Sequence, residues 1–145
     1  MAEFESKIAS NTVYDEFDSI PLSRMNCSSQ DGRFTENIYR NRYPDVIPYD
    51  DTRVRLIPTK ENLHGYINAS HVKVRIENTI YSYIAAESPL SSTVYDFWRM
   101  ISGSNVHVIV MLLGNDRQLC ANYFPHSKTE PIRTDEFEIE LLSEQ

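Results

Sequence analysis

Residues 41–54 read N-R-Y-P-D-V-I-P-Y-D-D-T-R-V, and the interpretation of the whole chain starts from this stretch. Pro44 and Pro48 bias the residues before them towards extended geometry, which predicts a stiffened loop and not a helix. Tyr43 and Asp45 lie two positions apart on that loop. The pair suits a planar ligand with a peptide backbone, because the ring offers stacking area and the carboxylate accepts amide hydrogens. Such a pair is also common on ordinary surface loops, so it does not decide a function alone.

Three later stretches extend the pattern. Residues 65–70 read G-Y-I-N-A-S, and residues 83–100 contain P-L followed by D-F-W-R-M. Residues 108–111 read V-I-V-M, and residues 120–125 read C-A-N-Y-F-P. Together with the loop, these blocks resemble, in family order, the start of the catalytic domain of the tyrosine-specific protein tyrosine phosphatases. Four ordered blocks over roughly residues 36–141 are far more specific than a single short motif.

The resemblance implies roles for the two loop residues, which are the candidate substrate-binding residues. Tyr43 would be a stacking platform for a phosphotyrosine ring, and Asp45 would accept backbone amides of the substrate. The implied partner is therefore a phosphotyrosine-containing protein or peptide. Pro44 stands where many members carry a basic residue, so a preference for acidic flanking sequence is not implied.

The catalytic groups of the family lie further along than Gln145 in family order. They are the W-P-D general-acid loop, the H-C-x-x-G-x-x-R nucleophile loop and a water-positioning glutamine. Residues 1–145 are thus expected to be a single partial domain, in which about 12–145 correspond to the N-terminal portion of the phosphatase domain. We expect no catalytic residue in this chain and no activity of the chain alone. The alternative is a non-catalytic pseudophosphatase module that binds phosphotyrosine or another protein through Tyr43 and Asp45.

Residues 27–33 spell C-x5-R, the spacing of a cysteine phosphatase loop. That chemistry needs glycines whose backbone N–H groups converge on phosphate, and surroundings that favour a thiolate. Here Asn26 precedes the cysteine in place of histidine, and Gln30 stands where the first glycine belongs. No apolar strand leads into the motif, so we predict that Cys27 is not a nucleophile.

One departure from the family pattern bears on function. Where the family has T-Q-G-P-L, residues 86–90 read A-E-S-P-L. Glu87 is expected to place a charge where an amide normally bonds, and Ser88 to place a Cβ where glycine permits a positive φ. The departure points to a diverged or inactive member.

Composition excludes several classes of protein. The 145 residues suit one domain, and a formal charge of −7 opposes binding to nucleic acid or to an anionic membrane. The longest apolar run, residues 106–113, is too short to span a bilayer, and the N-terminal residues lack the apolar core of a signal peptide. Cys27 and Cys120 are too few for a disulfide framework, and the histidines are scattered. We expect a cytoplasmic protein with no metal and no cofactor.

Hydrophobic periodicity predicts two helices. Apolar residues at helical spacing predict the first over Thr12–Ile20. The second is expected through Val94–Ile101, capped by Ser92 or by Thr93, with Asp96 completing a capping box if Thr93 is the cap.

The remaining patterns predict strands. Residues 53–57 are one strand, and residues 72–85 form a half-buried hairpin around a turn at Asn78. Residues 106–113 are apolar on both faces, which is typical of the central strand of a covered sheet. Residues 137–141 alternate with glutamates and predict a strand buried on one face. The sum is an α/β fold: a mixed twisted sheet flanked by helices, as an incomplete phosphatase-like domain.

These expectations have a consequence for stability. The central strand at 106–113 needs cover on both faces, and the predicted helices offer too little. The last strand, 137–141, presents an apolar face and an open edge that invites self-association. We therefore predict that the chain does not fold as a stable monomer alone.

Overall fold

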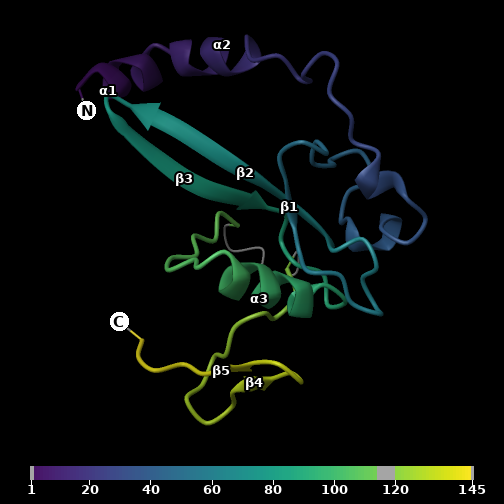
Figure 1. The fold of residues 1–145 in the computed structure, drawn as a ribbon. Coiled ribbons are helices and arrows are strands. Elements are labelled where there is room, and N and C mark those ends of the chain that lie inside the picture. Colours follow the sequence, from purple (N-terminus) through teal and green to yellow (C-terminus); the bar gives the residue numbers. More distant parts are fainter. Residues whose placement is uncertain (1, 114–119, 145) are drawn as a thin grey trace.

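The computed structural model describes residues 2–113 and 120–144. The chain begins with two helices, α1 (Ala2–Ala9) and α2 (Thr12–Asp18), and continues through two short 3-10 turns, η1 (Asp31–Arg33) and η2 (Ile38–Arg40). The remaining elements are β1 (Arg53–Arg55), β2 (Tyr66–Ile76), β3 (Thr79–Ala86), α3 (Val94–Gly103), β4 (Ile132–Arg133) and β5 (Glu138–Ile139). Figure 1 shows α1 and α2 lying apart from the body that contains β1, α3 and the β4–β5 hairpin.

The main sheet has the order β1-β2-β3, and both ladders are antiparallel. The predicted hairpin is confirmed, with Ile76 opposite Thr79 across a two-residue turn. The positive φ of that turn lies at Glu77, at 53°, and not at Asn78 as the sequence predicted. Combined with the helices, this arrangement confirms the α/β expectation, and the second sheet, β4-β5, is antiparallel as well.

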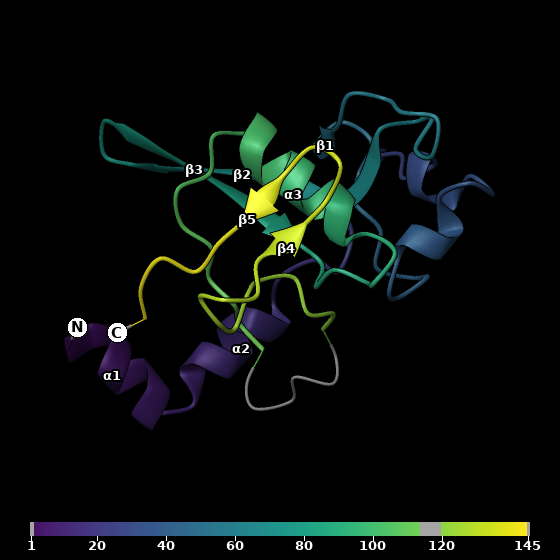
Figure 2. The same ribbon diagram turned by 90° about the horizontal axis from the view of Figure 1, so that it is seen from below.

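The expected half-burial of this hairpin is wrong for its outer part. Tyr66, Ile67 and Ala69 at the start of β2 are buried, whereas every residue from His71 to Ile76 is exposed. Figures 1 and 2 show why, since the hairpin extends as an arm past α3 and its tip lies away from the rest of the sheet. The alternation of apolar residues is present, but the described residues supply nothing that covers the apolar side.

The hydrophobic core lies where α3 packs against β1 and the inner part of β2. Its buried members are Val54, Leu56, Ile67, Ala69, Phe97, Met100 and Tyr123. Trp98 is partly buried against this cluster, and its indole N–H donates to the Tyr123 carbonyl at 2.6 Å. The C-terminal part of the described chain is therefore attached to α3 through aromatic packing and one polar contact.

The predicted capping box of α3 is wrong, although the helix itself is confirmed. Thr93 is the N-cap, but its hydroxyl accepts from the Leu90 N–H at 2.9 Å and does not bond the first turn. Asp96 is buried and pairs with Arg40 at 2.5 Å instead of returning to the cap. A tertiary ion pair thus replaces the local contact that the spacing predicted.

The central strand expected over residues 106–113 is also wrong. The segment has no strand assignment, and Val110 and Leu112 are 73% and 91% exposed. A strand needs a neighbour to satisfy its backbone groups, and the two sheets of the described chain include no ladder to this segment. Its apolar residues are therefore left on the surface.

The two ends of the chain agree better with the sequence patterns. Phe137, Ile139 and Leu141 are half-buried between exposed Glu138 and Glu140, so the predicted alternation is confirmed, although β5 itself is only two residues long. Helix α2 begins at Thr12 as predicted and ends at Asp18, and it buries none of its residues. Helix α1 was not predicted.

Candidate functional site

Residues 41–46, the Tyr43 loop, connect η2 to the extended stretch before β1 without regular structure, as the prolines predicted. The Tyr43 carbonyl accepts from the Val46 N–H at 3.2 Å, which closes a turn around Pro44 and Asp45. Tyr43 is 50% exposed and Asp45 is exposed. Both candidate binding residues are therefore on the surface of one tight turn.

The turn is anchored from beneath by the side chain of Asn41, which is buried. Its amide nitrogen donates to the carbonyls of Gly32 at 3.0 Å and Asn37 at 3.2 Å. Its amide oxygen accepts from the Tyr66 hydroxyl at 2.6 Å and from the Asn68 side chain at 3.0 Å. A primary amide offers two donors and two acceptor positions, so every one of them is used. Sequence reasoning missed this residue, because its partners come from three separate parts of the chain.

Two neighbours of Asn41 extend the anchor. The Asn68 amide also donates to the Val46 carbonyl at 2.7 Å, which holds the far end of the Tyr43 loop against β2. Burial, with the nearby charge of Glu87, raises the pKa of the Tyr66 hydroxyl. Tyr66 therefore keeps its proton and remains a hydrogen-bond donor to Asn41.

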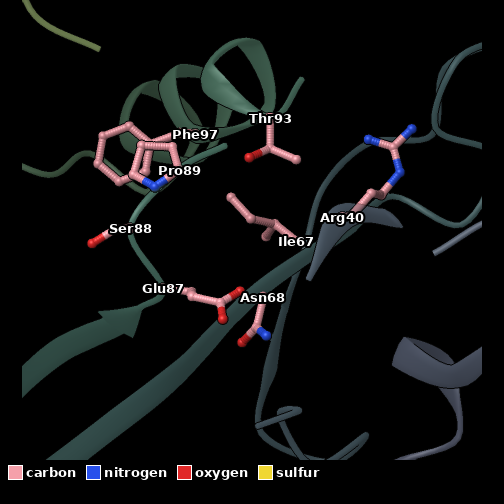
Figure 3. A pocket seen from close by; sticks show the side chains of 8 residues that line it. All are labelled: Arg40, Ile67, Asn68, Glu87, Ser88, Pro89, Thr93 and Phe97. Atoms are coloured by element: carbon pink, nitrogen blue, oxygen red, sulfur yellow. The ribbon is translucent and has the colours of Figure 1, made fainter. Parts of the chain in front are cut away.

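The charge that Glu87 places where the family pattern has an amide is paired in the structure. Its carboxylate lies at the end of β3 and accepts from the backbone N–H of Arg42 at 2.8 Å and of Tyr43 at 3.0 Å, one on each oxygen. In Figure 3 the Glu87 side chain points inward, towards Asn68 on β2. The backbone N–H donors of the loop are the partners of this charge.

The segment after Glu87 accepts hydrogen bonds from a side chain of the loop. The Arg42 guanidinium donates to the carbonyls of Ser88 at 3.2 Å and Pro89 at 2.9 Å. Ser88 is not among the described residues with positive φ, so its side chain causes none of the backbone strain that the sequence predicted. The A-E-S-P-L segment is therefore held by hydrogen bonds to the loop and has no positive φ at Ser88.

A second carboxylate, that of Asp50, holds the backbone at the start of η1. Asp50 accepts from the backbone N–H of Gln30 at 2.9 Å and of Asp31 at 3.0 Å. Partial burial opposes its ionisation, but a hydrogen bond from Ser28, these two N–H groups and the Arg53 charge outweigh that effect. The pKa of Asp50 is therefore held below its ordinary value.

The 3-10 turn η2, which leads into the Tyr43 loop, is tied to the core by Arg40. Its guanidinium pairs with the buried carboxylate of Asp96 at 2.5 Å and also donates to the Glu61 carbonyl. Arg99 lies 3.8 Å from the same carboxylate. Charged and polar contacts near Arg40 and Asp96 thus connect the loop, β2, β3 and α3.

Two hollows lie near the site, and the larger one is lined in part by residues of the loop itself. The smaller, about 10 Å³, lies between Arg40, Asn68, Glu87 and the start of α3, and Figure 3 shows the side chains around it. It has room for about one water molecule. The larger, about 270 Å³, is open to solvent on the other side of the loop, and its lining is Gly32, Arg33, Ile38, Asn41, Pro44 and Ile47. The second hollow is mostly apolar where it meets Pro44.

The C-x5-R motif does not have the geometry of a phosphate loop. Gly32 is buried in the three-residue turn η1, and a Cβ there would lie 2.2 Å from Ile47 and 2.6 Å from the Tyr66 hydroxyl. Glycine at position 32 therefore allows Ile47 and Tyr66 to pack closely against the backbone. Cys27 and Cys120 are free thiols. Within residues 2–113 and 120–144 no three His, Cys, Asp or Glu side chains gather as a metal site would require.

Comparison with known proteins relates this geometry to a family. The profile of the family described as protein-tyrosine phosphatase matches residues 37–145. Rat tyrosine-protein phosphatase non-receptor type 21 is 42% identical over 127 residues, which are 83% of this chain and 11% of the relative. Human tyrosine-protein phosphatase non-receptor type 20 is 34% identical over 147 residues, 97% of this chain and 33% of the relative.

A solved structure gives the same result. The crystal structure of the catalytic domain of human protein tyrosine phosphatase non-receptor type 18 superposes with a TM-score of 0.69 and 33% identity. The match covers 99% of this chain and 50% of that catalytic domain. The chain therefore spans about half of a solved catalytic domain and a third or less of the two curated relatives.

Proposed function

The chain belongs to the protein-tyrosine phosphatase family, and on that premise we propose that it is the substrate-recognition portion of a phosphotyrosine phosphatase domain. It matches the N-terminal part of such a domain. The observation that carries the proposal is the Tyr43 loop, an exposed aromatic turn held by buried polar anchors.

We assign the two exposed residues of the turn separate roles. Tyr43 stacks on the phenyl ring of phosphotyrosine, and Asp45 accepts backbone N–H groups of the substrate peptide. The fixed backbone of the loop supports this assignment, because a platform contributes most when its orientation is set before binding. Pro44 stands where many members of the family carry a basic residue, so acidic flanking residues are not favoured.

The chain alone is proposed to be catalytically inactive. Hydrolysis in this family uses a cysteine thiolate that attacks phosphorus and an acid that protonates the leaving phenol. The chain supplies neither group at the Tyr43 loop, and Cys27 lies in a segment without a phosphate cradle. We also propose a cytoplasmic location, supported by the non-receptor relatives; no helix in the described part of the chain is long and apolar enough to cross a bilayer.

The test of inactivity is turnover of a phosphotyrosine peptide by the purified chain, with Cys27→Ser as the matched variant. We expect no phosphate release above a buffer blank from either protein. Turnover that disappears in the Cys27→Ser variant would assign catalysis to the C-x5-R motif and overturn the proposal. Turnover that is equal in both proteins identifies a contaminant.

Binding separates the proposal from its alternative, a non-catalytic binding module. Stacking on Tyr43 contributes about 0.5–1.5 kcal/mol beyond area burial. We therefore expect a phosphotyrosine peptide to bind more weakly than about 1 mM, which is about −4 kcal/mol. Calorimetry that gives micromolar affinity, lost in Tyr43→Ala, would favour the autonomous module.

A further inference from the structure

Glu87 stands where the family pattern has a glutamine, and its hydrogen-bond partners suit a carboxylate better than an amide. The Arg42 and Tyr43 N–H groups reach separate oxygens of the one carboxylate, at 2.8 and 3.0 Å. A carboxylate has two acceptor oxygens, whereas a glutamine amide has one acceptor oxygen and a nitrogen that only donates. A glutamine in this geometry would therefore satisfy one backbone N–H and turn a donor towards the other.

The contacts run in both directions between the same two segments. Glu87 reaches from the end of β3 to the loop backbone, while Arg42 reaches from the loop to the carbonyls of Ser88 and Pro89. Each side chain is charged, and each bonds backbone groups of the opposite segment. We call these four hydrogen bonds the Arg42–Glu87 latch.

The latch acts on the backbone of Tyr43 itself. The N–H of Tyr43 is one of the two groups held, and the direction of its ring follows from the backbone that carries it. The ring is half exposed, so little side-chain packing competes with the latch for control of its orientation. The other anchors, Asn41 and Asn68, hold the loop at its two ends.

We infer that Glu87 is a positioning residue for substrate recognition: its two carboxylate oxygens hold the Arg42 and Tyr43 amides and so orient the Tyr43 ring towards a phosphotyrosine peptide. The inference rests on the proposed function for its ligand. The latch itself does not depend on the proposed function, because it is a property of the free chain. The departure from the family pattern is, on this account, an alternative solution to holding the loop.

The experiment measures residue-resolved amide hydrogen exchange of the full chain by mass spectrometry, with no ligand, so that self-association does not prevent it. The variants are Glu87→Gln, which keeps shape but has one acceptor oxygen, and Glu87→Ala, which has none. Glu140→Gln removes a charge from an exposed residue far from the loop in sequence and is the matched control. The amides of Ile67 and Ala69, in the core, report opening of the whole fold.

A hydrogen bond to a charged group contributes about 1.5–3 kcal/mol, so its loss should raise local opening about tenfold or more. In Glu87→Ala both the Arg42 and the Tyr43 amide should exchange at least about tenfold faster, and in Glu87→Gln one of them should. The core amides, and all amides of Glu140→Gln, should be unchanged.

Two results would overturn the inference. Full protection of both loop amides in Glu87→Gln would mean that the second oxygen is not needed. Equal loss at the loop and the core in both variants would make Glu87 a residue of global stability and not of positioning. Failure of the proposed function gives a different result, because the exchange pattern would hold while the chain shows phosphotyrosine turnover that Cys27→Ser abolishes.

Discussion

The Tyr43 loop and the 106–113 segment are opposites in composition and in outcome. The loop is polar and irregular, yet its backbone and the side chain beneath it form hydrogen bonds to η1, to β2 and to Glu87 after β3. The segment is among the most apolar stretches of the chain, yet residues 108–112 are exposed and have no backbone hydrogen bond within the described residues. The apolar composition of residues 106–113 therefore did not bury them, and the polar composition of the Tyr43 loop did not leave its backbone without partners.

The difference lies in where the partners come from. Every anchor of the loop is supplied between residues 31 and 96, all within the described chain. A central strand needs a neighbour on each side and cover on each face, and the two sheets of the described chain provide none of these to residues 106–113. Order in this protein follows the availability of partners more closely than local hydrophobicity.

The largest expected effect is a contrast in amide exchange between the core beside the loop and this segment. In the wild-type chain the amides of Tyr66, Ile67 and Ala69 should exchange at least about a hundredfold more slowly than those of residues 108–112, because exchange follows local opening. NMR or mass spectrometry on the same sample gives both values. Equal protection would mean that the segment forms a strand in solution, and the comparison would fail.

The next largest effect tests the packing that supports the loop. Gly65 has a φ of 51°, and a Cβ there would lie 2.0 Å from the Leu56 carbonyl oxygen. Gly65→Ala should therefore raise the free energy of the β1–β2 region by about 2–3 kcal/mol, seen as faster exchange at Leu56 and Tyr66. Gly103→Ala is the matched control, since its Cβ would meet nothing within 4 Å. Equal effects of the two substitutions would contradict the steric reason.

A third substitution tests the exposed side of the comparison. Val110 and Leu112 are two of the exposed apolar side chains of residues 106–113, at 73% and 91%. The double variant Val110→Lys, Leu112→Lys should lower binding of a hydrophobic dye and shift the chain towards monomer in light scattering. Core exchange should change by less than about 0.5 kcal/mol, as for other surface substitutions.

The control for that variant is Ile57→Lys, which adds a charge at another exposed apolar residue. If Ile57→Lys reduces association equally, the effect is one of net charge and the segment is not the contact. If the wild-type chain is already a monomer with a sharp thermal transition, the prediction of an unstable monomer is wrong.

The smallest effect is a dependence of the loop region on acid. The pKa of Asp50 in the folded chain is lower than its ordinary value of 3.8, so its ionised form stabilises the fold above about pH 3.8. That contribution should disappear as the pH falls through the lower, folded-state pKa. An acid titration followed at the Gln30 and Asp31 amides should show this step, and Asp50→Asn should remove it. A step that survives the substitution belongs to another carboxylate.

Glu87 and Asp96 show the limits of reading carboxylates from sequence. Both were interpreted from their neighbours, Glu87 as a charge in place of an amide and Asp96 as part of a helix cap. In the structure each is bonded to a group more than forty positions away, Arg42 for Glu87 and Arg40 for Asp96. Spacing within a motif carries no information about such partners, because they are set by how separate elements pack.

The sequence by itself determined the features that depend on near neighbours. Pro44 and Pro48 kept residues 41–52 out of helix and strand, alternation produced the β2–β3 hairpin, and helical spacing located α3. The ordered blocks identified the family, because many positions in one order cannot match by chance. These properties follow from backbone bias and side-chain period, which act over a few residues.

Only the tertiary structure decided what each polar group bonds and which apolar surfaces are covered. The four contacts of Asn41, the two oxygens of Glu87 and the exposure of residues 108–112 have no signature in the local pattern. The physical reason is the same in each case. Burial and hydrogen bonding are satisfied between segments distant in sequence, so their outcome depends on which partners the fold brings within reach.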